Sequence, residues 1–512
     1  MSAVAPTQSP TLKLLRNVAG VWFGPAAERA LLAGVDVLIS EGRVAQVGRE
    51  LIAPDGCEVI EASQLLVLPG FVNAHHHLTQ QLTRTIVPSG DVFEWLAACY
   101  PIWARLTAAQ AGIGARIGLA ELVLTGVTTT ADLSYYFPAG RPDIFDAQIE
   151  AARDIGIRIL AVRGGMLDVG DAVRSRIGDS IASTIESPDT LLSELERAAK
   201  QYHDPAQESM LRIGMGLTEP LWEAPGLMRE LAELAKVHGL AAHTHLHPRP
   251  GDLEACAPSS IADRLTELGW WNDRLWVAHG TRLDAGLLDR MIADGVGFVT
   301  CPSSNARLGT SLAPAWRFAE RGELPAIGVD GAASNDGGDM LGEIRLAWQI
   351  QRHASSGSEY FAGLEPRTVL DWATVGGAGA LGWEGLGELT LGGLADLACF
   401  DVSGLEYVGD QDLLDALVLC GVSHRAELVL VGGKAVVRDG RLVGVDEDEL
   451  AHQGRAATLE LFTSRSARVP SATQLLDLEE RLCDQVAVDS DVEYYWAAAG
   501  EVHTDRLQIA FV

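Results

Sequence analysis

The sequence has no apolar run as long as the roughly 18 residues that a transmembrane helix needs. Its first dozen residues are polar and include proline, without the basic segment and apolar stretch of a secretory signal. Positive charge is scarce as well, since 39 Lys and Arg face 69 Asp and Glu, a formal net charge of −30. Binding to nucleic acid or to anionic membranes depends on Lys and Arg. We therefore expect a cytoplasmic protein that binds neither.

Lysine and cysteine are also rare. Only four of the 39 basic residues are Lys, and residues 70–385 contain two of them, Lys200 and Lys236, both in segments with helical patterns. The seven cysteines are odd in number, scattered and mostly in apolar stretches. This usage is typical of reduced thiols in a cytoplasmic protein and argues against a disulfide framework.

The middle of the chain repeats one pattern, in which an amphipathic helix is followed by glycine and then by a short apolar strand. Glycine directly after a helix is typical of a left-handed helix cap. Helices that alternate with buried strands indicate parallel βαβ units. At least five such units over about 300 residues predict an α/β fold, a (β/α)8 TIM barrel rather than an open sheet.

Both ends of the chain differ from the middle. Residues 12–68 and about 388–445 contain short strand patterns, and Glu41-Gly42 and Gly432-Gly433 each separate two of them, as in a two-residue β-hairpin. We predict that the two ends form one small β-sandwich beside the barrel. The expected domains are 1–68 for the first part of the sandwich, 69–387 for the barrel, 388–463 for the second part of the sandwich, and 464–512 for a C-terminal extension of unknown role.

The most informative segment is 69–77, in which an apolar stretch leads through Pro-Gly to three consecutive histidines. Alternate residues of a strand face the same side, so His75 and His77 are expected to point together and His76 away. A surface histidine run or a tag is the alternative, but a tag would lie at a terminus. Two imidazoles at the end of a buried strand form half of a metal site.

Three further apolar strands end in a histidine or an aspartate, at residues 240–245, 275–279 and 326–330. In a (β/α)8 barrel the working residues lie at these carboxyl ends. A single histidine there is usually a packed core residue, but chance does not explain four such endings on different strands of the repeating helix–strand pattern. Three imidazoles and a carboxylate suit one divalent ion, Zn²⁺ or alternatively Fe²⁺, which activates water. A second ion would need a bridging ligand, often a carbamylated Lys, and both lysines of this region lie in helical segments.

Five motifs together resemble the amidohydrolase superfamily, and within it the subgroup of 8-oxoguanine deaminases, hydroxyatrazine hydrolases and triazine chlorohydrolases. The motifs are Asn-Ala-His-His-His at 73–77, His-Thr-His-Leu at 243–246, Val-Ala-His-Gly at 277–280, Cys-Pro-Ser-Ser-Asn at 301–305 and Val-Asp-Gly-Ala-Ala-Ser-Asn-Asp at 329–336. The resemblance covers about residues 12–450 and includes segments 95–103 and 136–140. It implies a homodimeric barrel hydrolase with one metal ion and a small-molecule substrate.

The resemblance also implies roles for individual residues. The metal ligands would be His75, His77, His245 and Asp330. Asp330 would also take a proton from the metal-activated water, and His279 would orient the attacked centre and stabilise the developing charge. Gln80 matches a position that contacts the heterocycle. The pocket would be lined by Trp95, Tyr100 and Asn305. Ordinary packing is the alternative for Gln80 and for these three residues.

One position departs from the family pattern. Family deaminases carry a Glu three residues after the metal histidine of the later strand, where it moves a proton to a ring nitrogen and to the leaving amine. Here that position is Pro248, which cannot exchange protons. His247 shares the strand parity of His245 and titrates near neutral pH, so it is the candidate catalytic replacement; a loop histidine beside prolines is the alternative. Glu254 and, more weakly, Asp336 are further candidates.

These observations leave three functions open. The first is deamination of an aminated N-heterocycle, such as a guanine-, pterin- or triazine-like ring. The second keeps the metal but cleaves another bond, by dechlorination, alkylamine removal or opening of a cyclic amide or amidine, because a better leaving group needs less help from a proton donor. The third is an inactive barrel that serves as a binding or scaffold protein, although such relatives usually lose the ligands that this sequence retains.

Overall fold

The computed structural model describes residues 12–138, 141–167, 174–175, 179–220, 223–246 and 258–463. The candidates His247 and Glu254, the substituted position Pro248, and the predicted extension 464–512 lie outside the described residues. Among the described residues, no helix combines the length and the apolar character that a membrane crossing requires.

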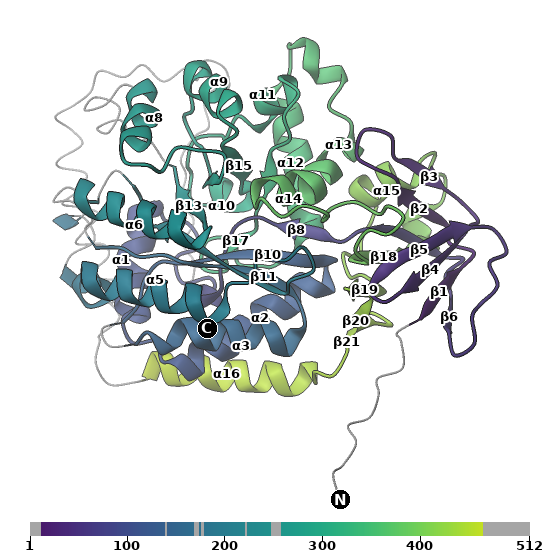
Figure 1. The fold of residues 1–512 in the computed structure, drawn as a ribbon, viewed down its shortest axis with the longest axis horizontal. Coiled ribbons are helices and arrows are strands. Elements are labelled where there is room, and N and C mark those ends of the chain that lie inside the picture. The colour runs from purple at the N-terminus through teal and green to yellow at the C-terminus, as the bar shows by residue number, and fades with distance from the viewer. Residues whose placement is uncertain are drawn as a thin grey trace, which may run out of the picture. The chain divides into compact units, whose positions relative to one another are not determined.

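Within the described chain, eight strands form one parallel sheet, in the order β16-β15-β14-β13-β12-β11-β10-β8 (Figure 1). The sheet is nearly closed, because the Ala74 N–H, directly after the first strand, donates to the Ile327 carbonyl of the last strand at 3.0 Å. The predicted barrel is therefore confirmed. Its strands are β8 (Phe71–Asn73), β10 (Val127–Ser134), β11 (Arg158–Arg163), β12 (Leu211–Leu217), β13 (Ala241–His245), β14 (Leu275–Ala278), β15 (Gly297–Thr300) and β16 (Ala326–Ile327).

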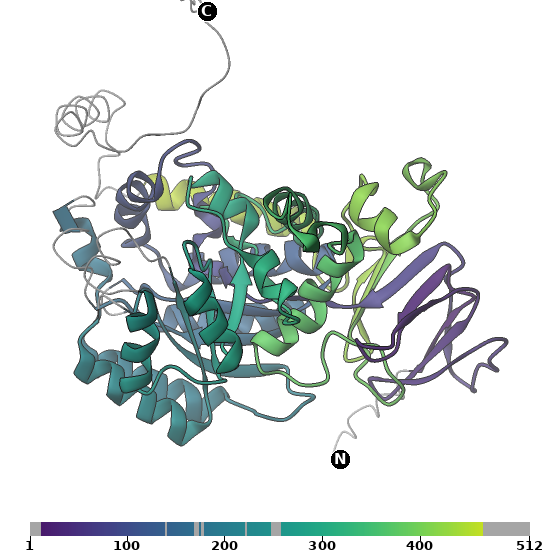
Figure 2. The same ribbon diagram turned by 90° about the horizontal axis from the view of Figure 1, so that it is seen from above.

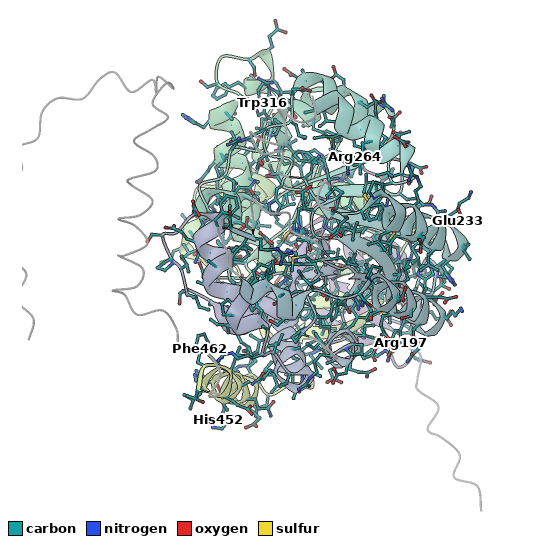
Figure 3. The ribbon with its side chains drawn as sticks, turned by 90° about the vertical axis from the view of Figure 1, so that its left-hand side faces the viewer. Arg197, Glu233, Arg264, Trp316, His452 and Phe462 are labelled. Carbon is teal, nitrogen blue, oxygen red and sulfur yellow. The ribbon has the colours of Figure 1, made fainter. Side chains whose placement is uncertain are left out.

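Helices alternate with these strands and lie around the sheet (Figures 1 and 2). The helix–glycine–strand pattern located them correctly, since α3 (Asp143–Ile155) and α6 (Pro225–His238) both end in a left-handed glycine, Gly156 and Gly239, with φ values of 81° and 69°. Glu233 lies on the exposed outer face of α6 (Figure 3), opposite the buried apolar residues that pack against the barrel.

The remaining helical elements are numbered in chain order. The α-helices are α1 (Val92–Trp103), α2 (Ala108–Leu124), α5 (Pro188–Tyr202), α8 (Pro258–Glu267), α9 (Ala285–Ala293), α10 (Pro302–Arg307), α11 (Ala315–Glu320), α12 (Met340–Ala354), α13 (Pro366–Asp371), α14 (Gly377–Ala380), α15 (Leu413–Leu419) and α16 (Glu447–Thr463). The short helices are η1 (Leu78–Thr83), η2 (Asp179–Thr184), η3 (Glu359–Ala362), η4 (Trp372–Gly376) and η5 (Leu405–Tyr407).

One further sheet is built from the N-terminal part of the chain alone, and another combines strands from both ends (Figure 2). Their orders are β5-β4-β1-β6 and β21-β20-β19-β18-β7-β2-β3, and the pairing of β7 with β18 joins the two ends. Leu15 of the first sheet and Val67 of the second belong to one buried apolar cluster, so the sheets pack as the predicted sandwich. The strands are β1 (Lys13–Arg16), β2 (Gly20–Phe23), β3 (Ala30–Leu32), β4 (Asp36–Ser40), β5 (Arg43–Gly48), β6 (Glu58–Glu61), β7 (Leu65–Pro69), β18 (Leu397–Asp401), β19 (Leu428–Val431), β20 (Lys434–Arg438) and β21 (Arg441–Leu442).

Both predicted hairpins are present. Glu41 and Gly42 connect β4 to β5 with φ values of 51° and 75°, and Gly432 and Gly433 connect β19 to β20 with 53° and 72°. Two successive positive φ values are the geometry of a type I′ turn. The turns also touch each other, because a Cβ on Gly42 would lie 2.8 Å from the Gly432 carbonyl oxygen.

The first and last strands of the barrel differ from the prediction. The sequence predicted unbroken strands that end in His77 and in Asp330. Instead, β9 (His76–His77) and β17 (Asp330–Gly331) are separate from the barrel sheet and pair with each other. Gly328 permits the close crossing, because a Cβ at this position would lie 2.6 Å from the Cβ of His75.

We expect Gly328→Ala to lower the free energy of unfolding by about 1–3 kcal/mol, the usual cost of overpacking a tight site. The added methyl group would press on the Cβ and backbone of His75. Thermal unfolding measures the effect. Gly337→Ala is the matched control, since no described atom lies within 4 Å of a Cβ there. Equal melting temperatures for Gly328→Ala and the native chain would contradict the close approach.

Candidate metal centre

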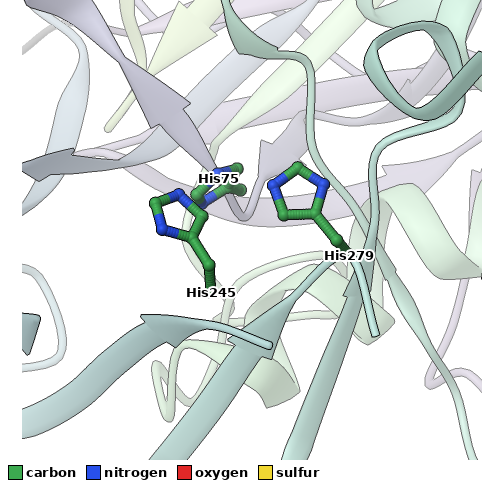
Figure 4. A group of neighbouring side chains, drawn as sticks. All are labelled: His75, His245 and His279. Atoms are coloured by element: carbon green, nitrogen blue, oxygen red, sulfur yellow. The ribbon is translucent and has the colours of Figure 1, made fainter. Parts of the chain in front are cut away.

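Four histidines and one aspartate meet at the carboxyl ends of the barrel strands. They are His75 after β8, His77 at the end of β9, His245 at the end of β13, His279 after β14 and Asp330 at the start of β17. Figure 4 shows His75, His245 and His279 converging from separate elements. A parallel barrel brings residues that are distant in sequence to this one face.

The donor atoms of these side chains are close enough to share one ion. Asp330 Oδ1 lies 3.3 Å from His75 Nε2 and 3.2 Å from His77 Nε2. His77 Nε2 lies 3.0 Å from His245 Nε2. One donor atom from each of His75, His245 and His279 also lies within 4.8 Å of the other two. The described residues therefore include a His/Asp cluster that can hold a metal ion.

Backbone carbonyls determine which nitrogen of two rings carries the proton. His77 Nδ1 lies 2.7 Å from the Leu133 oxygen, and His245 Nδ1 lies 2.6 Å from the Thr218 oxygen. A carbonyl oxygen only accepts hydrogen bonds, so both Nδ1 atoms are protonated. In the neutral rings, the two Nε2 lone pairs then face each other at 3.0 Å. Such an arrangement is repulsive unless a cation lies between them, so the donor set fits a metal ion.

The electrostatic environment favours the metal-binding protonation states. Burial lowers the pKa of His75 and His245 well below the ordinary histidine value, and it lowers the pKa of His77 as well. Burial alone would raise the pKa of Asp330, but its contact with His75 and the neighbouring imidazole rings hold that pKa well below its ordinary value. Neutral imidazoles and an ionised carboxylate are the forms that bind metal ions.

The two oxygens of Asp330 have different surroundings. Oδ1 faces the Nε2 atoms of His75 and His77 and also accepts the Gly331 N–H at 2.8 Å. Oδ2 accepts hydrogen bonds from the hydroxyls of Ser304 at 2.5 Å and Ser334 at 3.1 Å. The carboxylate is thus held with Oδ1 toward His75 and His77 and with Oδ2 toward the two serine hydroxyls.

His279 is oriented by Asn305. The His279 Nδ1 lies 2.9 Å from the Asn305 side-chain oxygen, and its Nε2 lies 3.9 Å from Asp330 Oδ2. His279 and Asp330 have φ values of 70° and 60°. Left-handed backbone at residues other than glycine is costly and occurs often at functional sites.

Gln80 lies beside the metal centre. A Cβ on Gly331, the neighbour of Asp330, would lie 1.9 Å from Gln80 Oε1, and Gln80 Nε2 donates to the Tyr135 hydroxyl at 3.2 Å. Gln80 is fully buried, and its Oε1 has no hydrogen-bond partner among the described residues. This oxygen is therefore a buried acceptor that the described residues leave without a donor.

The other residues predicted for the pocket are buried close by. Trp95 Nε1 donates to the Ala333 carbonyl at 2.8 Å, which ties α1 to the loop that follows Asp330. The Tyr100 hydroxyl contacts Met166 Sδ at 3.2 Å. Asn305 binds His279, as described above, so its side-chain oxygen is already engaged within the protein.

Sequence reasoning missed Tyr135. Its ring lies edge-on to those of His77 and His245, with centroids 4.8 and 5.7 Å apart. Tyr135 directly follows β10, so its place after a barrel strand was the available signal. Ser304 and Ser334 were part of quoted motifs, but nothing in the sequence indicated that their hydroxyls bind Asp330.

Asp336 has partners away from Asp330. Its Oδ1 accepts the Thr85 N–H at 2.7 Å, and its carboxylate forms an ion pair with Arg307. The weaker candidate for the proton-transfer role thus links the loop after β17 to the segment before α1.

Comparisons with known proteins agree with this geometry. The sequence profile of the amidohydrolase family matches residues 66–436. The 8-oxoguanine deaminase of Pseudomonas aeruginosa is 36% identical over 434 residues, 83% of this chain and 94% of the relative. The hydroxydechloroatrazine ethylaminohydrolase of Pseudomonas sp. strain ADP is 33% identical over 82% of this chain and 90% of its own.

Solved structures show the same relationship. The zinc complex of an atrazine chlorohydrolase from Arthrobacter aurescens TC1 superposes with a TM-score of 0.80 at 29% identity, over 87% of this chain and all of that one. The profile match covers most of the chain, and the similarity to the P. aeruginosa enzyme extends over nearly the whole length of that enzyme. The chain belongs to the amidohydrolase family.

Proposed function

We propose that this chain uses metal-activated water to cleave a C–N bond, and that the reaction is deamination of an aminated N-heterocycle. One observation carries the proposal: the Nε2 lone pairs of His77 and His245 face each other beside Asp330, with both ring protons held by backbone carbonyls. Zn²⁺ is the proposed ion, with Fe²⁺ as the alternative, and the ligands would be His75, His77, His245 and Asp330.

Each neighbouring residue has a role in this proposal. A divalent ion bound there supplies Lewis acidity and makes water nucleophilic at neutral pH. Asp330 accepts the proton of the attacking water. His279, held by Asn305, stabilises the charge that develops on the attacked ring.

The residues around the His/Asp cluster suit a flat, polar ring. Gln80 Oε1 is an acceptor with no partner among the residues described, and it suits an N–H group of a heterocycle. Trp95 and Tyr100 bring aromatic surface to the same cluster, where Trp95 and Trp103 have ring centroids 5.4 Å apart. Aminated heterocycles of the guanine, pterin or triazine type combine both features.

Pro248 supports a second candidate function. Without the family Glu, protonation of a poor leaving group such as ammonia needs another donor, and His247 is the proposed one. The same metal site would serve other reactions that need different proton transfers. These are displacement of halide or an alkylamine and opening of a cyclic amide or amidine. The relatives include an ethylaminohydrolase and a chlorohydrolase, which fits this candidate.

A scaffold without catalysis is less well supported, because all four proposed ligands are retained and converge. From the family resemblance we also propose that the protein is cytoplasmic and forms a homodimer. The proposed domain boundaries remain 1–68, 69–387, 388–463 and 464–512.

The first test is release of ammonia by the zinc-loaded protein from guanine, 8-oxoguanine, isoxanthopterin, cytosine, melamine and hydroxyatrazine-type triazines. We expect turnover of at least one compound, loss of turnover after chelation, and recovery with Zn²⁺. Halide and alkylamine release from chlorinated and alkylaminated triazines is measured in parallel. If the protein is fully loaded with zinc but releases no ammonia from any compound of the panel, deamination of these rings is rejected in favour of the second function.

His245→Ala should remove one ligand and abolish both stoichiometric zinc binding and turnover. Asp330→Asn should reduce kcat by roughly 10²–10⁴-fold, the usual contribution of a general base, even in samples that retain zinc. His353→Ala, on the exposed face of α12, is the control and should change neither property. Zinc content by atomic emission and steady-state kinetics give both readouts. Stoichiometric zinc in His245→Ala would refute the ligand assignment.

His247→Ala tests the replacement for the missing Glu. If His247 donates the proton to the leaving amine, kcat for ammonia release should fall by roughly 10²-fold or more, while zinc content stays the same. A rate within about threefold of the native value, roughly 0.6 kcal/mol of barrier, would exclude this role.

A further inference from the structure

His243 contacts a proposed ligand without being a ligand itself. It precedes His245 by two residues on β13, and its Nε2 lies 2.7 Å from His75 Nδ1. Its other nitrogen, Nδ1, lies 2.9 Å from the Trp276 carbonyl oxygen. The His243 ring also stacks on the Trp276 indole, with centroids 4.3 Å apart and planes 13° apart. His243 and His75 are both completely buried.

The direction of these hydrogen bonds follows from the carbonyl. The Trp276 oxygen can only accept, so His243 Nδ1 carries a proton and donates it. The Nε2 of a neutral His243 is then an acceptor, and its partner, His75 Nδ1, must be the donor. A neutral His75 with its proton on Nδ1 presents the Nε2 lone pair toward Asp330 Oδ1, 3.3 Å away.

We propose that His243 is a positioning residue that fixes His75 in the tautomer required for metal binding. The relay runs from the Trp276 carbonyl through His243 to His75 Nδ1. It gives His75 the protonation state that His77 and His245 receive directly from the Leu133 and Thr218 carbonyls. His75 has no such carbonyl contact among the described residues, so an imidazole takes its place.

The reverse arrangement is unfavourable in this environment. A doubly protonated His243 would donate to His75 and move the His75 proton to Nε2, where it would block the lone pair. This state would place a charge in a fully buried ring beside the imidazoles of the cluster, and no described carboxylate forms an ion pair with it. The stacked indole and the carbonyl of Trp276 instead hold a neutral ring in one orientation.

This inference rests on the metal site of the proposed function, but not on its substrate or reaction. The test is therefore Zn²⁺ affinity, measured at one fixed pH by competition with a chromogenic chelator. The native chain is measured first. Failure of the native chain to bind Zn²⁺ would reject the proposed function, whereas the ratios between variants test the relay.

Two substitutions test whether His243 acts as a hydrogen-bond acceptor for His75 or only fills the space beside it. His243→Leu fills the space but offers no acceptor to His75, and the affinity for Zn²⁺ should fall by about 10–100-fold, as for other lost outer-shell partners. His243→Gln carries an acceptor and a donor on one amide, so it can bind His75 Nδ1 and the Trp276 oxygen. It should keep the affinity within about threefold of native.

His76→Gln is the matched control, because His76 is equally buried but neither ring nitrogen has a hydrogen-bond partner among the residues described. It should leave the Zn²⁺ affinity close to native. Equal losses in His243→Gln and His243→Leu, or no loss in His243→Leu, would overturn the relay.

Neutron diffraction of the native chain gives an independent answer if His243→Leu does not fold. The relay requires deuterium on His75 Nδ1 and on His243 Nδ1, and none on His243 Nε2. Deuterium on His243 Nε2, with none on His75 Nδ1, would refute the assignment.

Discussion

The rest of the site depends on one constraint: two unprotonated imidazole nitrogens are held close together inside the protein. His77 and His245 point their Nε2 atoms at each other across 3.0 Å, beside an ionised Asp330. In water such groups would turn apart or gain protons. Here backbone carbonyls hold the protons on the far nitrogens, and burial opposes any further protonation. A bound cation would resolve the conflict, so the cluster is a candidate metal centre rather than a set of core histidines.

The barrel supplies this constraint through its own backbone. The carbonyls of Leu133, Thr218 and Trp276 belong to or directly follow three different strands, and each accepts a hydrogen bond from a histidine on a neighbouring element. The same hydrogen bonds that orient the rings therefore link strands at the carboxyl face. Metal affinity and local order of this face are thus expected to depend on the same contacts.

Close packing completes the arrangement. Asp132 on β10 accepts hydrogen bonds from the Leu78 N–H at 2.8 Å and from Ser134 and Gln148, which fixes η1 directly after His77. Burial raises the pKa of Asp132 to about 7, although these hydrogen bonds oppose the shift. For such an acid the folded state retains its proton to higher pH than the unfolded chain does. Its contribution to stability consequently falls as pH rises from about 4 to about 7.

Much of the fold and the site could be predicted from the sequence, because each prediction depended on a local pattern. Glycines after amphipathic helices located the units of the barrel, and Glu41-Gly42 and Gly432-Gly433 located both hairpins. The histidine and aspartate endings located the candidate ligands. The breaks before His76 and at Gly328 could not be predicted in this way, because they arise from contact between the first and last strands, some 250 residues apart.

The sequence by itself determined which donors are present and at which strand ends they lie, since strand periodicity and chain order are local properties. Only the tertiary structure decided which nitrogen of each ring is free. That choice depends on the carbonyl or imidazole that faces the other nitrogen, such as Trp276 through His243 for His75. Tyr135, Ser304 and Ser334 also acquired their places beside the ligands only through folding, because closure of the barrel brings distant strand ends within hydrogen-bonding distance.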